Sequence, residues 1–199
     1  MHKIGHFLRQ SWLLMVCSFC FGILIALAGA AWSPRIEQNR IDKLNRLMGG
    51  LLPGAERFES AAQVEVESAR GKLLESAVYR AVGPEGETDG WVFNAVGSGF
   101  ADKIELVVAV GPDLETIKGF DCLASNETPG FGDRIKNAYF REQFEGAPAG
   151  GLTLAKTGDA QSIDDMIVAI TGATVSSRAV VDIINMYIGP VTKNIKSME

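Results

Sequence analysis

The residues best suited to chemistry lie in a hydroxyl-rich segment, residues 170–177, directly before a predicted helix. A turn that leads into a helix leaves backbone N–H groups unpaired, and the helix dipole favours negative charge at that end. Gly172 permits close approach of the backbone, and Arg178 in the first helical turn is placed to meet a phosphate. The segment also carries hydroxyl groups that can cap the helix, those of Thr174, Ser176 and Ser177. It therefore predicts an anion site, with an ordinary helix cap as the alternative.

The other reactive side chains do not form a catalytic group. The two histidines, His2 and His6, both precede a long apolar segment, so the part that follows cannot assemble a Ser-His-Asp arrangement. Cys17 and Cys20 are spaced as C-x-x-C inside the apolar segment, where no other type of metal ligand occurs. We expect them to pack, with a metal site shared with another chain as the alternative. Cys122 is the remaining cysteine, so no disulfide is expected in the aqueous part.

The apolar segment is long enough to cross a membrane. Residues 11–34 contain no Asp, Glu, Lys or Arg, and the stretch from Trp12 to Trp32 has 21 residues, where a spanning helix needs about 20. A Trp at each end suits the two headgroup regions, which favours a helix retained in the lipid bilayer. Small residues at 28–30 leave a cleaved signal peptide as the alternative. Basic residues flank both ends, so charge alone leaves the orientation open.

The charge of the chain excludes one class of partner. The 199 residues carry 24 acidic and 19 basic side chains, a formal net charge of −5, and Lys3 and Arg9 precede the apolar segment. The part that follows is therefore more acidic than the whole. Binding to nucleic acid needs clustered Lys and Arg to replace the counterions of the phosphates, so we expect no nucleic acid as a partner.

The length suits one domain with an appendage. We expect four parts: an N-terminus at 1–11, a transmembrane helix at 12–32, a juxtamembrane stalk at 33–72 and a domain at 73–199. Pro34 is expected to end the transmembrane helix, and the stalk is expected to be amphipathic up to Gly49-Gly50.

Within the domain, periodicity predicts strands first and helices later. Alternating apolar residues bounded by turn residues predict four strands, at 74–81, 91–93, 104–110 and 116–123. Helical spacing predicts two helices, over 132–144 and 176–188, with Tyr139 on the apolar face of the first and Gly189-Pro190 ending the second. The fold class is therefore α+β: a single transmembrane helix followed by an antiparallel sheet packed with helices.

Two motifs give the chain a resemblance to a known family. Thr171-Gly172-Ala173-Thr174, followed by Val175-Ser176-Ser177, resembles the S/T-G-A-T-x-S/T signature of the FMN-binding domain. Glu127-Thr128-Pro129-Gly130-Phe131-Gly132 resembles the E-T-P-G-L/F-G loop that lies beside the flavin in that family. The segments 90–93 and 97–100 resemble the strand pair upstream. This domain occurs in the G subunit of the Rnf ion-translocating electron transport complex and in the C subunit of the Na⁺-translocating NADH:quinone reductase.

The resemblance implies a cofactor and a set of site residues. The cofactor is FMN, joined to Thr174 by a phosphoester bond that a separate flavin transferase makes. The implied flavin contacts are Thr171, Gly172, Ala173, Ser176, Ser177 and Arg178 around the first motif, and Glu127, Thr128, Pro129, Gly130 and Phe131 in the second. Trp91, Phe93 and Phe100 are expected in the core. The family usually has an acid three positions before the tetrad, in the region that the transferase reads, and this chain has Val168 there.

The resemblance also implies a function and a location. The chain is expected to be the G subunit of an Rnf-type ferredoxin:NAD oxidoreductase complex, relaying electrons between neighbouring subunits during Na⁺ or H⁺ transport, with no active site of its own. It is expected to cross the cell inner membrane once, with a cytoplasmic N-terminus and the C-terminal domain on the periplasmic side. The alternatives are the C subunit of the quinone reductase, a membrane-anchored assembly module without flavin, and a self-contained flavin reductase.

Overall fold

The computed structural model describes residues 2–68 and 71–198. The chain divides into two compact units, Met1–Asp42 and Lys43–Glu199. Helix α1, His2–Leu51, makes up the first unit and contributes its last turns to the second. The large apolar side chains from Trp12 to Trp32 are exposed on it. Among the described residues, α1 is the one helix long and apolar enough to cross a membrane.

Helix α1 does not end at Pro34, contrary to the prediction, and continues to Leu51. A proline inside a helix removes one backbone hydrogen bond, but the residues after it are good helix formers. The Gln38 amide also donates a hydrogen bond to Asp42 Oδ1 at 2.9 Å, one turn further along. The preference of this segment for helix therefore outweighs the proline.

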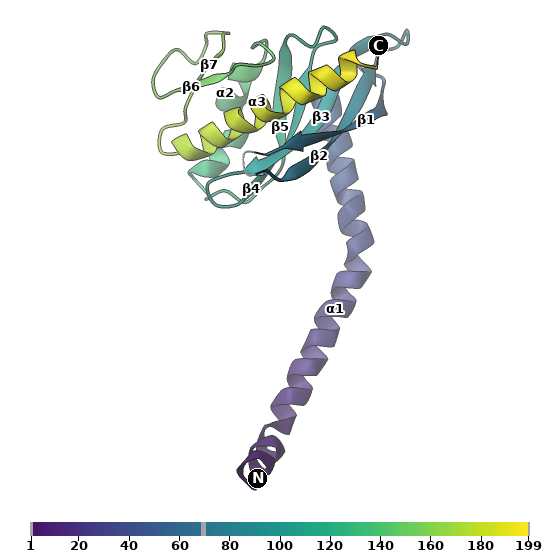
Figure 1. Cartoon of the computed structure of the whole chain (residues 1–199), viewed down its shortest axis with the longest axis vertical. Coiled ribbons are helices and arrows are strands. Elements are labelled where there is room, and N and C mark those ends of the chain that lie inside the picture. The colour runs from purple at the N-terminus through teal and green to yellow at the C-terminus, as the bar shows by residue number, and fades with distance from the viewer. Residues whose placement is uncertain (1, 69–70, 199) are drawn as a thin grey trace. The chain divides into compact units, whose positions relative to one another are not determined.

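An antiparallel sheet lies at the centre of the second unit (Figure 1). Its order is β1-β2-β3-β4-β5, so each strand pairs with the next along the chain. The strands are β1 Arg57–Glu67, β2 Leu73–Val82, β3 Thr88–Ser98, β4 Lys103–Val110 and β5 Ile117–Ser125. The four predicted strands correspond to β2–β5, and the predicted α+β class with an antiparallel sheet is confirmed.

Strand β1 lies in the segment that the sequence assigned to the stalk, so the sheet begins before residue 73. It pairs with β2 from Arg57 opposite Val82 to Glu67 opposite Leu73. Val64 and Val66 are its buried core residues, and the positions between and beside them are exposed and partly acidic. One face of β1 is therefore apolar over only a short distance, so the alternation of apolar and polar residues is too short to predict a strand from the sequence.

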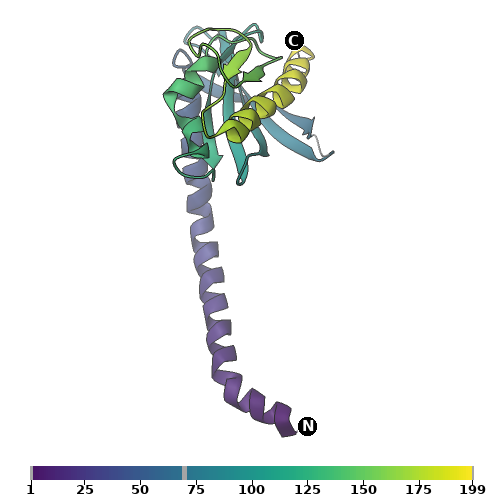
Figure 2. The same cartoon turned by 90° about the vertical axis from the view of Figure 1, so that its left-hand side faces the viewer.

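Helix α3, Thr174–Lys196, packs on one face of the sheet, and the last turns of α1 pack on the other (Figure 2). Successive residues of a strand point to opposite faces. Phe93 accordingly packs in the cluster that holds Ile184 of α3, while Val92 packs in the cluster that holds Met48 and Leu52. Each face of the sheet thus carries a buried apolar cluster.

Helix α3 begins close to its predicted start but extends through Pro190 to Lys196, so the predicted end at Gly189-Pro190 is wrong. Val191 and Ile195 lie beyond the proline and are both buried. They continue the apolar stripe of Ile184 and Tyr187 at helical spacing. Burial of this longer stripe outweighs the single hydrogen bond that Pro190 removes.

The helix predicted over 132–144 is instead three short pieces: η1 Gly132–Lys136, α2 Ala138–Arg141 and η2 Glu142–Phe144. Asn137 separates the first two because its backbone is extended, with φ −75° and ψ 144°. Phe140 and Phe144 are buried, whereas Tyr139, expected on the apolar face, is 46% exposed. A small parallel sheet follows, of β6 Thr153–Ala155 and β7 Met166–Val168, which the sequence did not predict.

Cys122 on β5 is buried, and its reactivity follows from that burial. Burial raises the pKa of the Cys122 thiol to about 12, and the neighbouring Asp121 carboxylate adds to the effect. Because the thiolate is the nucleophile, we expect Cys122 to resist alkylation by iodoacetamide at pH 8 in the folded protein and to react in denaturant. Peptide mass spectrometry distinguishes it from Cys17 and Cys20. Rapid labelling of Cys122 under native conditions would contradict this expectation.

Candidate functional site

A cavity of about 450 Å³ opens between three segments that are distant in the sequence. They are the turn between β3 and β4, the loop that follows β5, and the loop that leads into α3. The residues lining the cavity are Phe100, Thr128, Phe131, Gly132, Gly172, Ala173, Thr174, Val175 and Ser176. Both sequence motifs therefore meet at one cavity.

The tetrad 171–174 forms the turn that starts α3. Gly172 has a φ of +83°, a conformation that residues with a side chain rarely adopt. The Ala173 N–H bonds to Ile170 O at 2.9 Å, and the Ser177 N–H bonds to the carbonyl of Ala173, the residue before α3, at 2.9 Å. The N–H groups of residues 174–176 precede it and belong to the unpaired first turn of the helix. These three residues line the cavity, where such N–H groups suit an anion.

The three candidate hydroxyl caps do not cap α3. The N-cap is Ala173, without a side-chain hydrogen bond. Ser177 is buried, and its hydroxyl accepts from the Ile170 N–H at 3.1 Å and donates to Ala173 O at 2.9 Å. Ser176 is also buried and donates to a Glu127 carboxylate oxygen at 2.5 Å. Thr174 lines the cavity, half-buried, and no hydrogen bond of the described residues engages its hydroxyl.

The remaining candidates of the first motif lie outside the cavity lining. Thr171 is exposed, and its carbonyl accepts a hydrogen bond from Arg134 at 3.3 Å, which ties the turn to η1. Arg178 is exposed on α3, four residues after Thr174. Residues four apart share one face of a helix, so Arg178 lies on the same side of α3 as Thr174.

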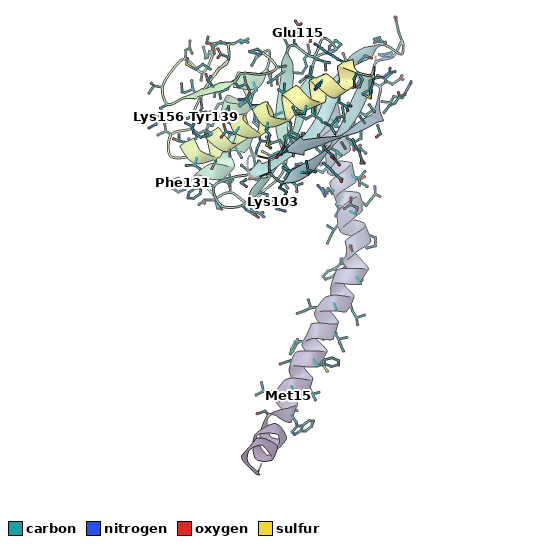
Figure 3. The ribbon with its side chains drawn as sticks, in the orientation of Figure 1. Met15, Lys103, Glu115, Phe131, Tyr139 and Lys156 are labelled. Carbon is teal, nitrogen blue, oxygen red and sulfur yellow. The ribbon has the colours of Figure 1, made fainter. Side chains whose placement is uncertain are left out.

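In the second motif, Thr128 and Phe131 line the cavity, whereas Pro129 and Gly130 shape the loop. The Phe131 N–H bonds back to Thr128 O at 3.2 Å, and Gly130 has a φ of +77° within this turn. The turn directs the Phe131 side chain outward, at 59% exposure (Figure 3).

Glu127 neither lines the cavity nor lies in solvent. It is 4% exposed, and its carboxylate accepts hydrogen bonds from the Ala101 N–H at 3.0 Å and from Ser176. The resemblance implied a flavin contact for this residue. The geometry supports a buried link between the two motifs instead.

Three residues of the cavity lining were absent from the predicted site: Phe100, Gly132 and Val175. Phe100 was expected in the core with Trp91 and Phe93, but only those two are buried, and Phe100 is 67% exposed. The sequence contained a signal for it, because a phenylalanine between Gly99 and the polar residues 102–103 lies in a turn, where little can cover the ring.

Comparison with known proteins shows the family to which the chain with this cavity belongs. Residues 99–189 match the model of the FMN-binding domain, and that range contains every residue of the cavity lining. The chain is similar to the G subunit of the ion-translocating oxidoreductase complex of Methanosarcina acetivorans, with 30% identity over 169 residues, 85% of this chain and 86% of that one. The chain belongs to this G-subunit family.

Further similarities agree with membership of the G-subunit family. The G subunit of the proton-translocating ferredoxin:NAD(+) oxidoreductase complex of Clostridium ljungdahlii is 32% identical over 167 residues, covering 84% of this chain and 82% of that one. The crystal structure of NqrC from Shewanella oneidensis has a TM-score of 0.56 at 20% identity, over 73% of each chain. This last likeness shows that the chain shares its fold with NqrC.

The cavity of this G-subunit family member fits FMN. Its volume of about 450 Å³ lies within the range of about 300–1,000 Å³ that is usual for cofactor sites. Phe100, Phe131 and Val175 offer apolar surface to a flat aromatic ring, and the start of α3 offers N–H groups to a phosphate. The lining thus offers a suitable surface to each of the two chemically different ends of FMN.

Val168, where the resemblance led us to expect an acid, lies in β7, and its backbone is held by two hydrogen bonds. The Gln143 side chain accepts from the Val168 N–H at 2.8 Å and donates to the Val168 carbonyl at 3.3 Å. The Val168 side chain is half-buried and lies beside Gly158 rather than in the cavity lining. An acid at this position is therefore not required for the geometry of the cavity.

Proposed function

We propose that this chain is the membrane-anchored flavoprotein subunit of an Rnf-type complex, an ion-translocating ferredoxin:NAD oxidoreductase, and that it relays electrons through FMN joined to Thr174 by a phosphoester bond. Membership of the G-subunit family and the matched FMN-binding domain support the electron-transfer role. The relatives that support it are named as subunits of such complexes, so other subunits of the complex are the electron donors and acceptors.

The attachment site is inferred from the burial and the hydrogen bonding of the hydroxyl groups at the start of α3. Ser176 and Ser177 are buried, and their protons are committed to Glu127 and to Ala173 O. Thr171 lies outside the cavity lining. Thr174 combines a hydroxyl without a hydrogen-bond partner among the described residues, a place in the lining and proximity to the unpaired N–H groups of α3. It is the hydroxyl of this motif best placed to carry a phosphoester.

The remaining site residues act by holding the cofactor. Bound FMN supplies the redox chemistry, and the protein sets its position and its environment. The residues with a holding role fall into two groups. Around the phosphate, Gly172 and Ala173 would let the backbone approach, the N–H groups of residues 174–176 would donate to its oxygens, and Arg178 would supply positive charge from the neighbouring turn of α3.

The second group surrounds the ring of the flavin. Phe131 and Phe100 would pack against it, because aromatic side chains offer a flat apolar surface. Thr128 would offer a hydroxyl to the flavin, and Pro129 and Gly130 shape the loop that carries Thr128 and Phe131. The two groups together would fix the cofactor at both ends.

Helix α1 anchors the chain in the lipid bilayer of the cell inner membrane. The exposed apolar side chains between Trp12 and Trp32 support a single crossing, and membership of a family of membrane complexes supports this location. The C-terminal domain then faces the periplasm, where a covalent bond prevents loss of the cofactor. A separate flavin transferase attaches the FMN on that side, and ion transport, of Na⁺ or H⁺, is a property of the whole complex.

Peptide mapping of the protein from its native membrane tests this proposal. We expect the peptide that spans residues 171–178 to carry FMN minus one water, with fragmentation placing the modification on Thr174. An unmodified Thr174 in the assembled complex would contradict the proposal and leave a membrane-anchored assembly module. FMN on Thr171 would keep the electron-transfer role and change the attachment site.

A further inference from the structure

A buried carboxylate lies directly behind the cavity lining. Glu127 is 4% exposed, and each of its two oxygens accepts a hydrogen bond: Oε1 from the Ala101 N–H at 3.0 Å, and Oε2 from the Ser176 hydroxyl at 2.5 Å. This arrangement suits an ionised carboxylate, which can accept hydrogen bonds through both of its oxygens. The ion pairs found among the described residues do not include Glu127. Its negative charge is therefore held by hydrogen bonds.

The backbone around Glu127 is shaped to admit this carboxylate. A Cβ atom at Gly99 would lie 2.3 Å from Glu127 Oε1, and one at Gly132 would lie 2.6 Å from Oε2 and 2.7 Å from Ser176 Oγ. These distances are far below van der Waals contact, so a side chain at either glycine would displace the carboxylate. Gly99, Gly132 and Ser176 come from the three segments that form the cavity, and all three converge on Glu127.

The Glu127 carboxylate lies against two residues of the cavity lining. Ser176 and Gly132 line the cavity, while Glu127 lies behind them. Each electron that reduces a flavin bound in the cavity would add negative charge close to the carboxylate. Because Glu127 is buried, its repulsion of that charge is screened less by water and salt than the repulsion from an exposed carboxylate would be. A charge in this place therefore opposes reduction of a bound flavin.

We propose that Glu127 is a positioning residue with two effects: its hydrogen bonds hold the turn that carries Phe100 against the start of α3, and its negative charge lowers the reduction potential of the flavin in the cavity. This inference rests on the proposed function, because it requires a flavin in the cavity. No bond is made or broken in this role. The electron comes from one subunit of the complex and leaves to another.

The variant Glu127→Gln tests the charge without removing the link. Glutamine can accept from the Ala101 N–H through Oε1 and donate to Ser176 Oγ through Nε2, so both bonds can persist while the charge is lost. In full-length protein made together with the flavin transferase, we expect FMN content close to that of the wild type and a midpoint potential shifted to a more positive value. The matched control is Glu115→Gln, which removes an exposed charge from the edge of the domain opposite Phe131 and Lys103 (Figure 3). Its midpoint potential should equal that of the wild type.

The link is tested separately in protein made without the transferase. We expect Glu127→Ala to make amide hydrogen exchange at Ala101 roughly ten-fold faster, because a hydrogen bond to a charged acceptor is lost. Glu127→Gln should restore slow exchange. Equal exchange at Ala101 in the wild type and Glu127→Ala would overturn the positioning role.

The outcomes separate this inference from the function on which it rests. A flavin-loaded Glu127→Gln variant with an unchanged or more negative potential overturns the inference and leaves the proposed function intact. A shift of the same size in Glu115→Gln also overturns it, because the effect would then be one of net charge. Wild-type protein that takes up no flavin would overturn both.

Discussion

Replacement of Thr174 by Ala is expected to reduce covalently bound FMN to the detection limit while the domain still folds. The variant lacks the motif hydroxyl that lines the cavity without a partner among the described residues. The Thr174 side chain does not cap α3, so its loss should change the free energy of unfolding by no more than about 0.5 kcal/mol. Flavin fluorescence of the denatured protein on a gel, after production with the transferase, measures the first effect. Chemical denaturation in detergent measures the second.

Two variants serve as controls for this result. Thr174→Ser restores a hydroxyl at the same position and should recover FMN at least in part. Thr171→Ala removes an exposed hydroxyl of the same motif and should retain covalent FMN. Covalent FMN in Thr174→Ala would refute Thr174 as the attachment site. Loss of FMN in Thr171→Ala, with a normal level in Thr174→Ala, would move the site to Thr171.

The largest effect on stability is expected from Phe120→Ala. Phe120 on β5 is buried and lies edge-on to two other buried rings, with its centroid 4.7 Å from that of Phe144 and 6.3 Å from that of Phe140. Truncation of a phenylalanine in such a core leaves a cavity and typically costs about 3–5 kcal/mol of the free energy of unfolding. Because native domains have about 5–15 kcal/mol in total, the variant should lose much of its stability in denaturant titration.

The matched control is Phe131→Ala, which makes the same chemical change at an exposed ring. Phe131 is far less covered, and a surface substitution usually changes stability by about 0.5 kcal/mol or less. We expect this variant to unfold like the wild type but to hold flavin in a less apolar environment, seen as a shifted absorption spectrum. Equal destabilisation by the two variants would show that the ring cluster does not support the domain.

The elements with a clear periodicity could be predicted from the sequence, and those fixed by distant contacts could not. Strands β2–β5 and the start of α3 have local apolar patterns that act over a few residues. Strand β1 has only Val64 and Val66 as its buried core residues, so its pairing with β2 decides its structure. Pro34 and Pro190 were expected to end helices because local propensity disfavours them there. The helix-forming residues after Pro34 and the buried side chains after Pro190 outweigh that cost.

For the candidate site too, local sequence patterns predicted some features, and contacts between distant residues determined the others. The glycine and hydroxyl pattern at 171–177 was sufficient to predict the turn at the start of α3, and the anion site there stays a prediction. The partners of its hydroxyl groups were not predictable, because Ser176 bonds to a carboxylate 49 positions away in the sequence. By residue type alone, the hydroxyls at positions 174, 176 and 177 are equivalent. The fold distinguishes them, since Thr174 lines the cavity while the two serines use their hydroxyls in buried hydrogen bonds.

The burial of Met48 and Leu52 against the sheet has a practical consequence for making a soluble fragment. Met48 is 1% exposed and Leu52 is 4% exposed, and the Lys43 ammonium donates to the Leu123 carbonyl. A fragment that begins after Gly49-Gly50, the predicted end of the amphipathic stalk, would strip part of the covering of Val92, Val107 and Ala109. Burial of a large apolar side chain contributes about 1.5–3 kcal/mol. Fragments that start between Arg35 and Lys43, after the apolar segment, should stay monomeric in solution, whereas those starting after Leu52 should aggregate through the uncovered sheet.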